Sequence, residues 1–447
     1  MNTIAKLLLF TTFTIFIVIC GFTFSQNIGY AENLTTNPPI NAQKLEQQLD
    51  ISLSPNIPAD VTITKGANTL EILQHDFDVF SWQSFIALNW PALPNGSPNI
   101  DEIIGIGGDR TTVWENYKEA YTIFPSDGQK PASWETEPVI PLACQSQATN
   151  GEPVFRMMQK VTDEVLDASN QAFKSGPLID RQGQYVRYAI HANKETFDYI
   201  QTNNLYNKVG QENFTFQVDF PSGNNNTQEI GSIILKSAWK ILSPNDEPKR
   251  FHTINALVYT PASTVPEVEE TCQRKTLGLV GFHISHKTKS SPQWIWSTFE
   301  HVDNLEVPSG SGLKPLFYNP DYKAPVNVPP PKPWNPNLPA PPTQVKRIIP
   351  IDEATKALNH QWQEKLKNIN PDSVWQYYEL ISTQWPTARK ASLTGNPAPQ
   401  FLANSTLETY NQGRVPNVSS SCIQCHLNAT TTNGKFSDFT YLLERAK

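Results

Sequence analysis

The sequence predicts an α+β protein with a mainly antiparallel β body and flanking helices. Short runs of alternating apolar and polar residues recur between residues 184 and 301, separated by polar turns. Stretches with helical periodicity lie before and after these runs. A chain of 447 residues with 11 tryptophans can also bury a broad core. The chain is therefore long enough for one large domain or two of ordinary size.

The N-terminus has the pattern of a secretory signal peptide, which we assign to residues 1–31. Lys6 precedes an uncharged apolar run over residues 7–20. This run is short for a membrane span, so we expect cleavage after Ala31 or Ser25. An uncleaved N-terminal anchor is the main alternative.

A polar arm and then a folded body follow the signal peptide. Residues 32–66 are rich in Pro and Asn and predict a surface arm. Residues 67–317 form the predicted α+β body. Its first helix is expected over residues 76–90, where aromatic residues recur at helical spacing. A second helix is expected over residues 111–121.

The strands of the predicted sheet come next. A hairpin turn at residues 180–183 precedes the first strand, and a short helix is expected over residues 193–206. The expected strands are 184–191, 232–242, 252–259, 277–287 and 293–301, and Cys272 is expected in the connection between the third and the fourth. Polar turns between short strands favour antiparallel pairing.

A Pro-rich strap and a C-terminal region follow the body. Residues 318–342 are too rich in proline for a helix or a central strand. Three aromatic residues that can anchor the segment, Tyr318, Tyr322 and Trp334, predict an ordered strap rather than a disordered linker. Residues 343–447 form a C-terminal region packed on the body. Helices are expected there over residues 351–369, 374–385 and 437–446.

The C-terminal region contains the motif Cys422-Ile423-Gln424-Cys425-His426. This C-x-x-C-H spacing is the attachment site of a c-type haem. The two thiols can add to the vinyl groups of the haem, and the histidine that follows them can bind the iron as proximal ligand. We therefore expect one covalently attached haem c, with Cys422, Cys425 and His426 as its attachment residues and His426 as the metal ligand.

Three other interpretations of the motif remain open. A structural zinc site needs four ligands, whereas only Cys422, Cys425 and His426 lie close together in the sequence. A thioredoxin-like redox pair requires a helix N-terminus in a βαβ context, whereas loop-like sequence flanks this motif. A simple disulfide between the two cysteines is the third alternative.

Haem is attached to c-type proteins outside the cytoplasm. The signal peptide and the motif therefore both predict an exported, periplasmic protein. In that oxidising compartment we expect a disulfide between the remaining cysteines, Cys144 and Cys272. Two buried free thiols are the alternative. The long loop between them predicts roughly 4–5 kcal/mol of stabilisation.

The net charge and the distribution of basic residues restrict the classes of partner that we expect. The formal net charge is −7, and the Lys and Arg residues are scattered. We therefore expect no nucleic-acid partner. The short N-terminal apolar run predicts no stable membrane span after cleavage of the signal peptide, and the haem motif predicts a redox protein as partner.

The distal side of the haem needs a residue from upstream, because no Met or His follows His426. The methionines of the mature chain are Met157 and Met158. We expect His301 to face the haem, with Glu300 and Asp303 beside it, and take His283 as the next candidate. The further histidines are His75, His191, His252, His286 and His360.

Several segments resemble a family of bacterial cytochrome c proteins that have a large N-terminal body and a single C-terminal haem motif. The matching segments are FSWQSFIALNWP, GSIILKSAWKIL, GLVGFHISHKT, PQWIWSTFEHVDN, SSCIQCHLNA and FTYLLERA. The resemblance covers roughly residues 70–447. It implies a haem on Cys422, Cys425 and His426, and it brings no assigned activity.

The function predicted from these observations is that of an exported mono-haem c-type cytochrome in electron transfer. The alternatives are a haem-dependent peroxidase or oxygenase-type enzyme with an open distal site, and a haem-based protein that binds a small ligand. A body of this size exceeds what an electron carrier needs, which favours recognition of a substrate or partner.

Overall fold

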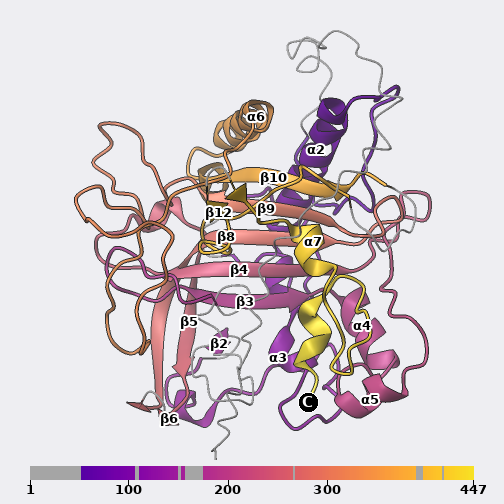
Figure 1. The fold of residues 1–447 in the computed structure, drawn as a ribbon, viewed down its shortest axis with the longest axis horizontal. Helices are drawn as coiled ribbons and strands as arrows, with labels where there is room; N and C mark the ends of the chain where they lie inside the picture. The colour runs from indigo at the N-terminus through magenta and orange to yellow at the C-terminus, as the bar shows by residue number, and fades with distance from the viewer. Residues whose placement is uncertain are drawn as a thin grey trace, which may run out of the picture. The chain divides into compact units, whose positions relative to one another are not determined.

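A nine-stranded, almost wholly antiparallel sheet forms the centre of the protein (Figure 1). The computed structural model describes residues 52–105, 110–149, 153–156, 175–264, 267–388, 396–414 and 417–447. The main path through the sheet is β1-β3-β4-β8-β9-β10-β11. Its strands are β1 Lys118–Glu119, β3 Arg187–Ala192, β4 Ile233–Ile241, β8 Thr271–His286, β9 Ile295–His301, β10 Tyr378–Pro386 and β11 Pro397–Ala398.

Two further strands extend the sheet along the first half of β8. Strand β5 (Thr253–Thr260) pairs with β8 in antiparallel fashion, and β2 (Val154–Arg156) pairs with β5 in parallel. Two small hairpins lie outside the sheet. They are formed by β6 Ser263–Thr264 with β7 Glu267–Val268, and by β12 Gly413–Arg414 with β13 Asn417–Val418.

The described helices are few. They are α2 Leu70–Leu88, α3 Ala120–Ile123, α4 Lys194–Thr202, α5 Lys208–Asn213, α6 Glu353–Ile369 and α7 Cys422–His426. Short 3-10 turns occur at Trp114–Asn116, Leu142–Cys144, Pro248–Arg250, Val374–Tyr377 and Tyr441–Arg445. The prediction of a mainly antiparallel α+β protein is confirmed.

Helices α2 and α6 bury their aromatic faces against one side of the sheet. Trp82 of α2 stacks on Trp362 of α6 with 5.7 Å between ring centroids, and its edge meets Phe299 of β9. The Trp82 indole N–H donates to the Asn359 side chain at 2.9 Å, so a buried polar group has its partner. The helices predicted for these two segments are confirmed.

The C-terminal part of the chain crosses the other side of the sheet. The Asn404 amide donates to Thr298 Oγ1 at 2.9 Å, and the Tyr188 hydroxyl donates to the Thr406 carbonyl at 2.9 Å. The crossing is so close at Gly281 of β8 that a Cβ there would collide with Thr406 Oγ1. Helix α7 lies in front of this side of the sheet in Figure 1.

The predicted strands are confirmed, with shifts of a few residues, but four predictions in the connecting regions are wrong. Residues 374–385 form a 3-10 turn and then strand β10, not a helix. Residues 437–446 contain only the 3-10 turn Tyr441–Arg445. Residues 111–121 are broken into short turns and β1. Cys272 belongs to β8 itself and not to a connection, because that strand begins at Thr271.

The error at β10 has a clear physical cause. Every residue of the strand except Glu379 is buried, since the helices cover one face of the sheet and the C-terminal segment covers the other. A strand buried on both faces loses the alternation of apolar and polar residues that would have identified it. The predicted C-terminal region therefore contributes β10 and β11 to the same sheet as the body.

The Pro-rich segment 318–342 lies against the body. Trp334 is only 9% exposed and packs with Ile179 and Tyr185. The Thr271 hydroxyl donates to the Asn337 side chain at 2.9 Å. Of the three expected anchors, Tyr322 is exposed.

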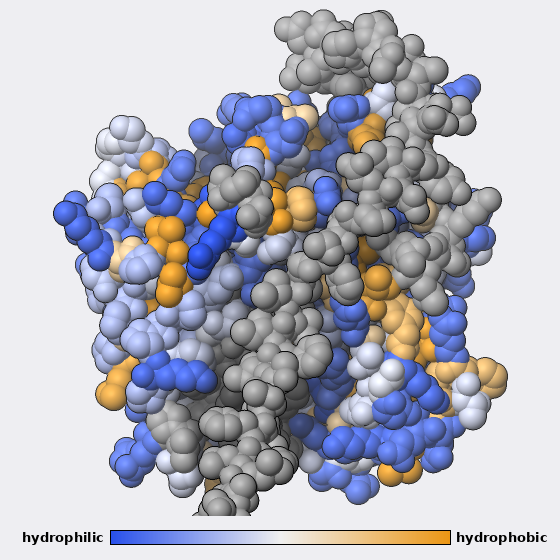
Figure 2. All heavy atoms as spheres, in the orientation of Figure 1, coloured by the Kyte–Doolittle hydropathy of each residue, from blue (hydrophilic) through white to orange (hydrophobic). Residues whose placement is uncertain are grey.

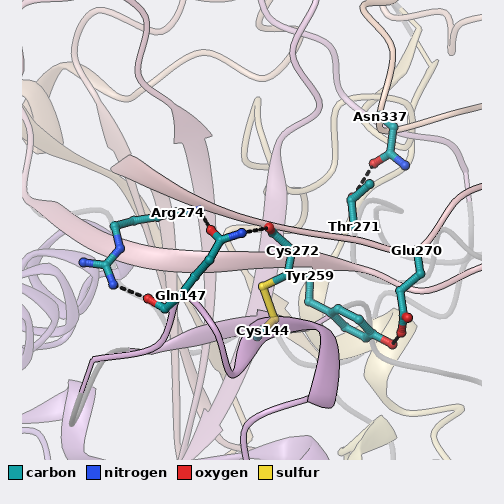
Figure 3. Close-up of a disulfide and its surroundings, with 8 residues drawn as sticks. All are labelled: Cys144, Gln147, Tyr259, Glu270, Thr271, Cys272, Arg274 and Asn337. Carbon is teal, nitrogen blue, oxygen red and sulfur yellow. Dashed lines mark hydrogen bonds between the residues drawn. A yellow bond between two sulfur atoms is a disulfide. The ribbon is translucent and has the colours of Figure 1, made fainter.

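A disulfide joins Cys144 to Cys272, as predicted (Figure 3). Their Cα atoms are 5.2 Å apart, and 128 positions separate them in the sequence. The Gln147 side chain donates to the Cys272 carbonyl at 2.7 Å, and Arg274 donates to the Gln147 carbonyl. The bridge thus ties the turn before residue 150 to the central strand β8.

Among the coloured residues of the face seen in Figure 2, hydrophilic ones predominate, and apolar residues form separate groups. No helix in the described part of the chain combines the length and apolar character that a membrane span requires. The expected signal peptide (1–31), Met157 and Met158 lie outside the described residues.

Candidate haem-attachment site

Helix α7 contains the whole C-x-x-C-H motif and is fixed to the end of β10. Ser421 is its N-cap, and its hydroxyl accepts from the Gln424 N–H at 3.4 Å. The Gln384 side chain of β10 accepts from the Ile423 N–H at 2.9 Å and from the Ser421 hydroxyl at 3.2 Å. Ile423 is fully buried beneath the motif. The sheet therefore sets the orientation of both cysteines and of the histidine.

The two cysteines of the motif are half-buried, and neither belongs to a disulfide. Burial raises the pKa of the Cys422 thiol well above its usual value, and Glu408 and Cys425 raise it further. Reactive cysteines in thiol–disulfide exchange have lowered pKa values. The environment of Cys422 therefore disfavours the thioredoxin-like interpretation.

His426 has a defined tautomer. Its Nδ1 lies 2.7 Å from the carbonyl oxygen of Phe439. A carbonyl can only accept, so Nδ1 bears the proton and Nε2 keeps its lone pair. Burial lowers the pKa of His426 to about 4, which keeps the imidazole neutral at pH 7. A neutral imidazole with an unprotonated Nε2 is the form that binds a metal.

Two aromatic rings pack around His426. The Trp296 ring of β9 lies 4.2 Å from the imidazole, and the Tyr441 ring lies 5.2 Å from it. The Tyr441 hydroxyl also donates to the Cys425 carbonyl at 2.8 Å, at the last turn of α7. These contacts restrict rotation of the imidazole.

The carbonyl that accepts from His426 belongs to an unusual turn. Asp438 and Phe439 both have positive φ angles, 55° and 64°. Non-glycine residues occupy this region only where the surroundings enforce it. The Asp438 carboxylate accepts from Lys287 at 2.5 Å and from the Phe220 N–H at 2.8 Å. The position of the Phe439 carbonyl therefore depends on a buried ion pair.

The prediction that His301 faces the haem is wrong. His301 lies five residues after Trp296 on β9, so its side chain points to the opposite face of the sheet. Its Nε2 lies 2.9 Å from the Arg250 carbonyl, and its Nδ1 accepts from the Asp303 N–H at 3.2 Å. The ring stacks on Phe251 at 4.2 Å. His301 thus has a structural role with both nitrogens occupied.

The two acidic residues expected beside His301 also have structural partners. Asp303 pairs with Arg250 at 2.6 Å. Glu300 points to the same face as Trp296, where it pairs with Arg347 at 3.0 Å and accepts from the Ser405 N–H and hydroxyl, each at 2.5 Å. Asp303 lies beside His301 as expected, with 3.9 Å between its carboxylate and His301 Nδ1, whereas β9 turns Glu300 to the opposite face.

His283 is the candidate that the structure brings to the side of the motif. It lies on β8, on the same face as Trp296, and its Nε2 is 3.3 Å from Glu408 Oε2. The other histidines have roles elsewhere or lie at the surface. His252 pairs with Glu115, His286 contacts the Ile230 carbonyl, His191 packs on Trp114, His75 is largely buried in α2, and His360 is exposed on α6.

Sequence reasoning missed Lys287 and Phe439, which position His426. It also missed Lys236 and Glu408, which are neighbours of His283. The motif GSIILKSAWKIL contains an alternating lysine that marks Lys236 as a polar residue on a strand. No local pattern marks Glu408, whose partner is 125 positions away.

The chain matches no family model, no curated protein and no solved structure. Among the residues that the structure describes, no group of three or more His, Cys, Asp or Glu side chains has the geometry of a metal-ion site.

Proposed function

We propose that this chain is an exported mono-haem c-type cytochrome with a redox role. Cys422 and Cys425 would hold the haem through thioether bonds, and His426 would bind its iron. The observation that carries the proposal is the 2.7 Å hydrogen bond from His426 Nδ1 to the Phe439 carbonyl. In metal sites the second ring nitrogen of a ligating histidine almost always donates to such a partner, which fixes the tautomer and the ring orientation.

The residues present fit a covalently bound haem. Neither thiol belongs to a disulfide, the two cysteines lie one turn apart on α7, and the histidine follows directly. When bound, haem c supplies an iron centre that cycles between its ferric and ferrous states. Trp296, Tyr441 and the Phe439 carbonyl keep His426 in one orientation, so the proximal ligand need not rearrange when the oxidation state changes. Small rearrangement favours electron exchange with a redox partner protein.

The disulfide supports export. Structural disulfides persist in oxidising compartments such as the periplasm and are rare in the cytosol. Cys144 and Cys272 form such a bridge, and both are buried. We therefore propose a periplasmic location, with the signal peptide removed.

Covalent haem attachment is tested on the full chain, produced in a host with a c-type maturation system. Protein denatured and separated by electrophoresis is stained for haem. We expect wild type to stain, and Cys422→Ala/Cys425→Ala to lose the stain. Cys144→Ala/Cys272→Ala is the matched control, since it also removes two cysteines but should keep the stain. Wild-type protein that contains zinc and no haem would overturn the proposal.

A further inference from the structure

A lysine and a histidine, Lys236 and His283, lie on the face of the sheet that contacts His426, and Glu408 joins them from the segment that crosses this face. Trp296 and Thr298 point to this face from β9. His283 of β8 is the direct cross-strand neighbour of Thr298, and Lys236 of β4 is the direct neighbour of His283. Direct neighbours on antiparallel strands have Cβ atoms about 5 Å apart. Lys236 and His283 therefore lie side by side, one row from the tryptophan that packs on His426.

The third side chain comes from the C-terminal segment that crosses this face. Glu408 Oε2 lies 3.3 Å from His283 Nε2 and accepts from the Asn404 N–H at 3.0 Å. Asn404 is itself bound to Thr298. Burial acts to raise the pKa of Glu408, but His283 and Lys236 outweigh it, so the pKa is lowered and the carboxylate is charged at pH 7. Glu408 can thus fix the ring of His283.

The cluster borders both points at which the haem would attach. Lys236, His283 and Glu408 all act electrostatically on His426, and Glu408 also acts on Cys422. A haem bonded to Cys422 and His426 must occupy space next to both residues. The same three side chains lie on the face of the sheet that carries Trp296, and therefore close to that space.

We propose that Lys236, His283 and Glu408 form the distal wall of the haem site, and that this wall binds the outer atom of a small diatomic or triatomic ligand on the iron. Lys236 supplies a hydrogen-bond donor. The Nε2 of His283 faces Glu408, so its ring donates to the ligand from Nδ1, as an imidazolium that Glu408 orients. The ligand class is one whose atom remote from the iron gains negative charge, such as dioxygen, carbon monoxide or azide. Donors in the distal pocket decide whether a haem takes such ligands. The inference rests on the proposed haem attachment.

His283 does not have the arrangement of an iron ligand. Its Nε2 is buried against Glu408 and makes no hydrogen bond of good geometry with any described atom. Binding iron through Nε2 would require the ring to leave the carboxylate. His283 also lies within β8, between β4 and β9, so its backbone is fixed by strands on both sides. The structure therefore assigns His283 to the distal wall and not to the iron.

The test uses the haem-loaded full chain and two probes, carbon monoxide on ferrous protein and azide on ferric protein. Infrared spectroscopy gives the stretching frequency of bound carbon monoxide, which falls as the field at the ligand becomes more positive. We expect Lys236→Met and His283→Leu to raise the frequency and Glu408→Gln to lower it. The loss of a charge-assisted hydrogen bond should weaken azide binding on the order of tenfold in Lys236→Met. Lys289→Met and His360→Gln, which change exposed residues, are the matched controls and should match wild type.

The outcomes separate the two proposals. Wild type without covalent haem would overturn the proposed function and this inference with it. Wild type with covalent haem whose carbon monoxide frequency and azide affinity are the same in all three variants would overturn this inference alone. A low-spin wild type that excludes both probes, and becomes high-spin in His283→Leu, would make His283 the sixth ligand and would also overturn it. Glu408→Gln preserves the shape of the side chain, so it decides the question even if the other variants fold poorly.

Discussion

The buried pair of Lys287 and Asp438 should control both the stability of the protein and the orientation of His426. Lys287 is 2% exposed, and its ammonium lies 2.5 Å from Asp438. It also pairs with Asp219, but that side chain is 80% exposed and should contribute little. Lys287→Met would leave the Asp438 carboxylate buried with the Phe220 N–H as its remaining partner.

Removal of one member of a buried ion pair costs roughly 3–5 kcal/mol, because the other charge is left without compensation. We expect a loss of this size in the free energy of unfolding, measured by urea denaturation at pH 8. Burial raises the pKa of Asp438 to about 6, and Lys287 opposes that rise. The variant should raise the pKa further, so the folded state takes up a proton more readily as the pH falls. The loss should therefore be smaller at pH 5 than at pH 8.

The same substitution, Lys287→Met, should also change the environment of the haem. Without the ion pair, the turn at Asp438 and Phe439 can leave its positive φ angles, and the Phe439 carbonyl then no longer fixes His426 Nδ1. We expect a changed haem absorption spectrum. Lys289→Met is the matched control, since Lys289 is exposed and only two positions away. The reasoning is refuted if the two variants differ by less than about 0.5 kcal/mol and have the same spectrum.

Three further predictions concern the body. Cys144→Ala/Cys272→Ala should lower the free energy of unfolding in urea by about 2–5 kcal/mol, because the bridge closes a long loop, and unchanged stability would contradict this. Burial raises the pKa of Asp78 from 3.8 to about 6, so its ionisation costs the folded state roughly 3 kcal/mol between pH 4 and pH 7. Asp78→Asn should therefore gain about that much relative to wild type over this range in urea titrations, and a difference independent of pH would refute the assignment. His301→Ala should cost roughly 1–3 kcal/mol through its lost hydrogen bonds and leave the haem spectrum unchanged, whereas a shifted spectrum would return His301 to the site.

The sequence predicted those parts of the fold whose pattern is local. The aromatic periodicity of α2 and the alternation in β3, β4 and β8 identified these elements, and the spacing of Cys422, Cys425 and His426 identified the motif. It failed at β10, where burial on both faces removes the alternation.

The surroundings of the motif could not be predicted in the same way. Glu300 and His301 are adjacent in the sequence, yet β9 turns them to opposite faces, and all seven of its residues are buried. Nothing local therefore says which of them faces the motif. Strand register and the path of the C-terminal segment bring Lys287, Asp438 and Glu408 to the site. Both are long-range features.

The most direct test of the central claim is tandem mass spectrometry of the peptide that spans residues 422–426, taken from protein purified from the periplasm. The account predicts one haem on this peptide, bonded to both Cys422 and Cys425. A peptide with two unmodified thiols, or with a disulfide between them, from cells whose other c-type cytochromes have their haem, would contradict it.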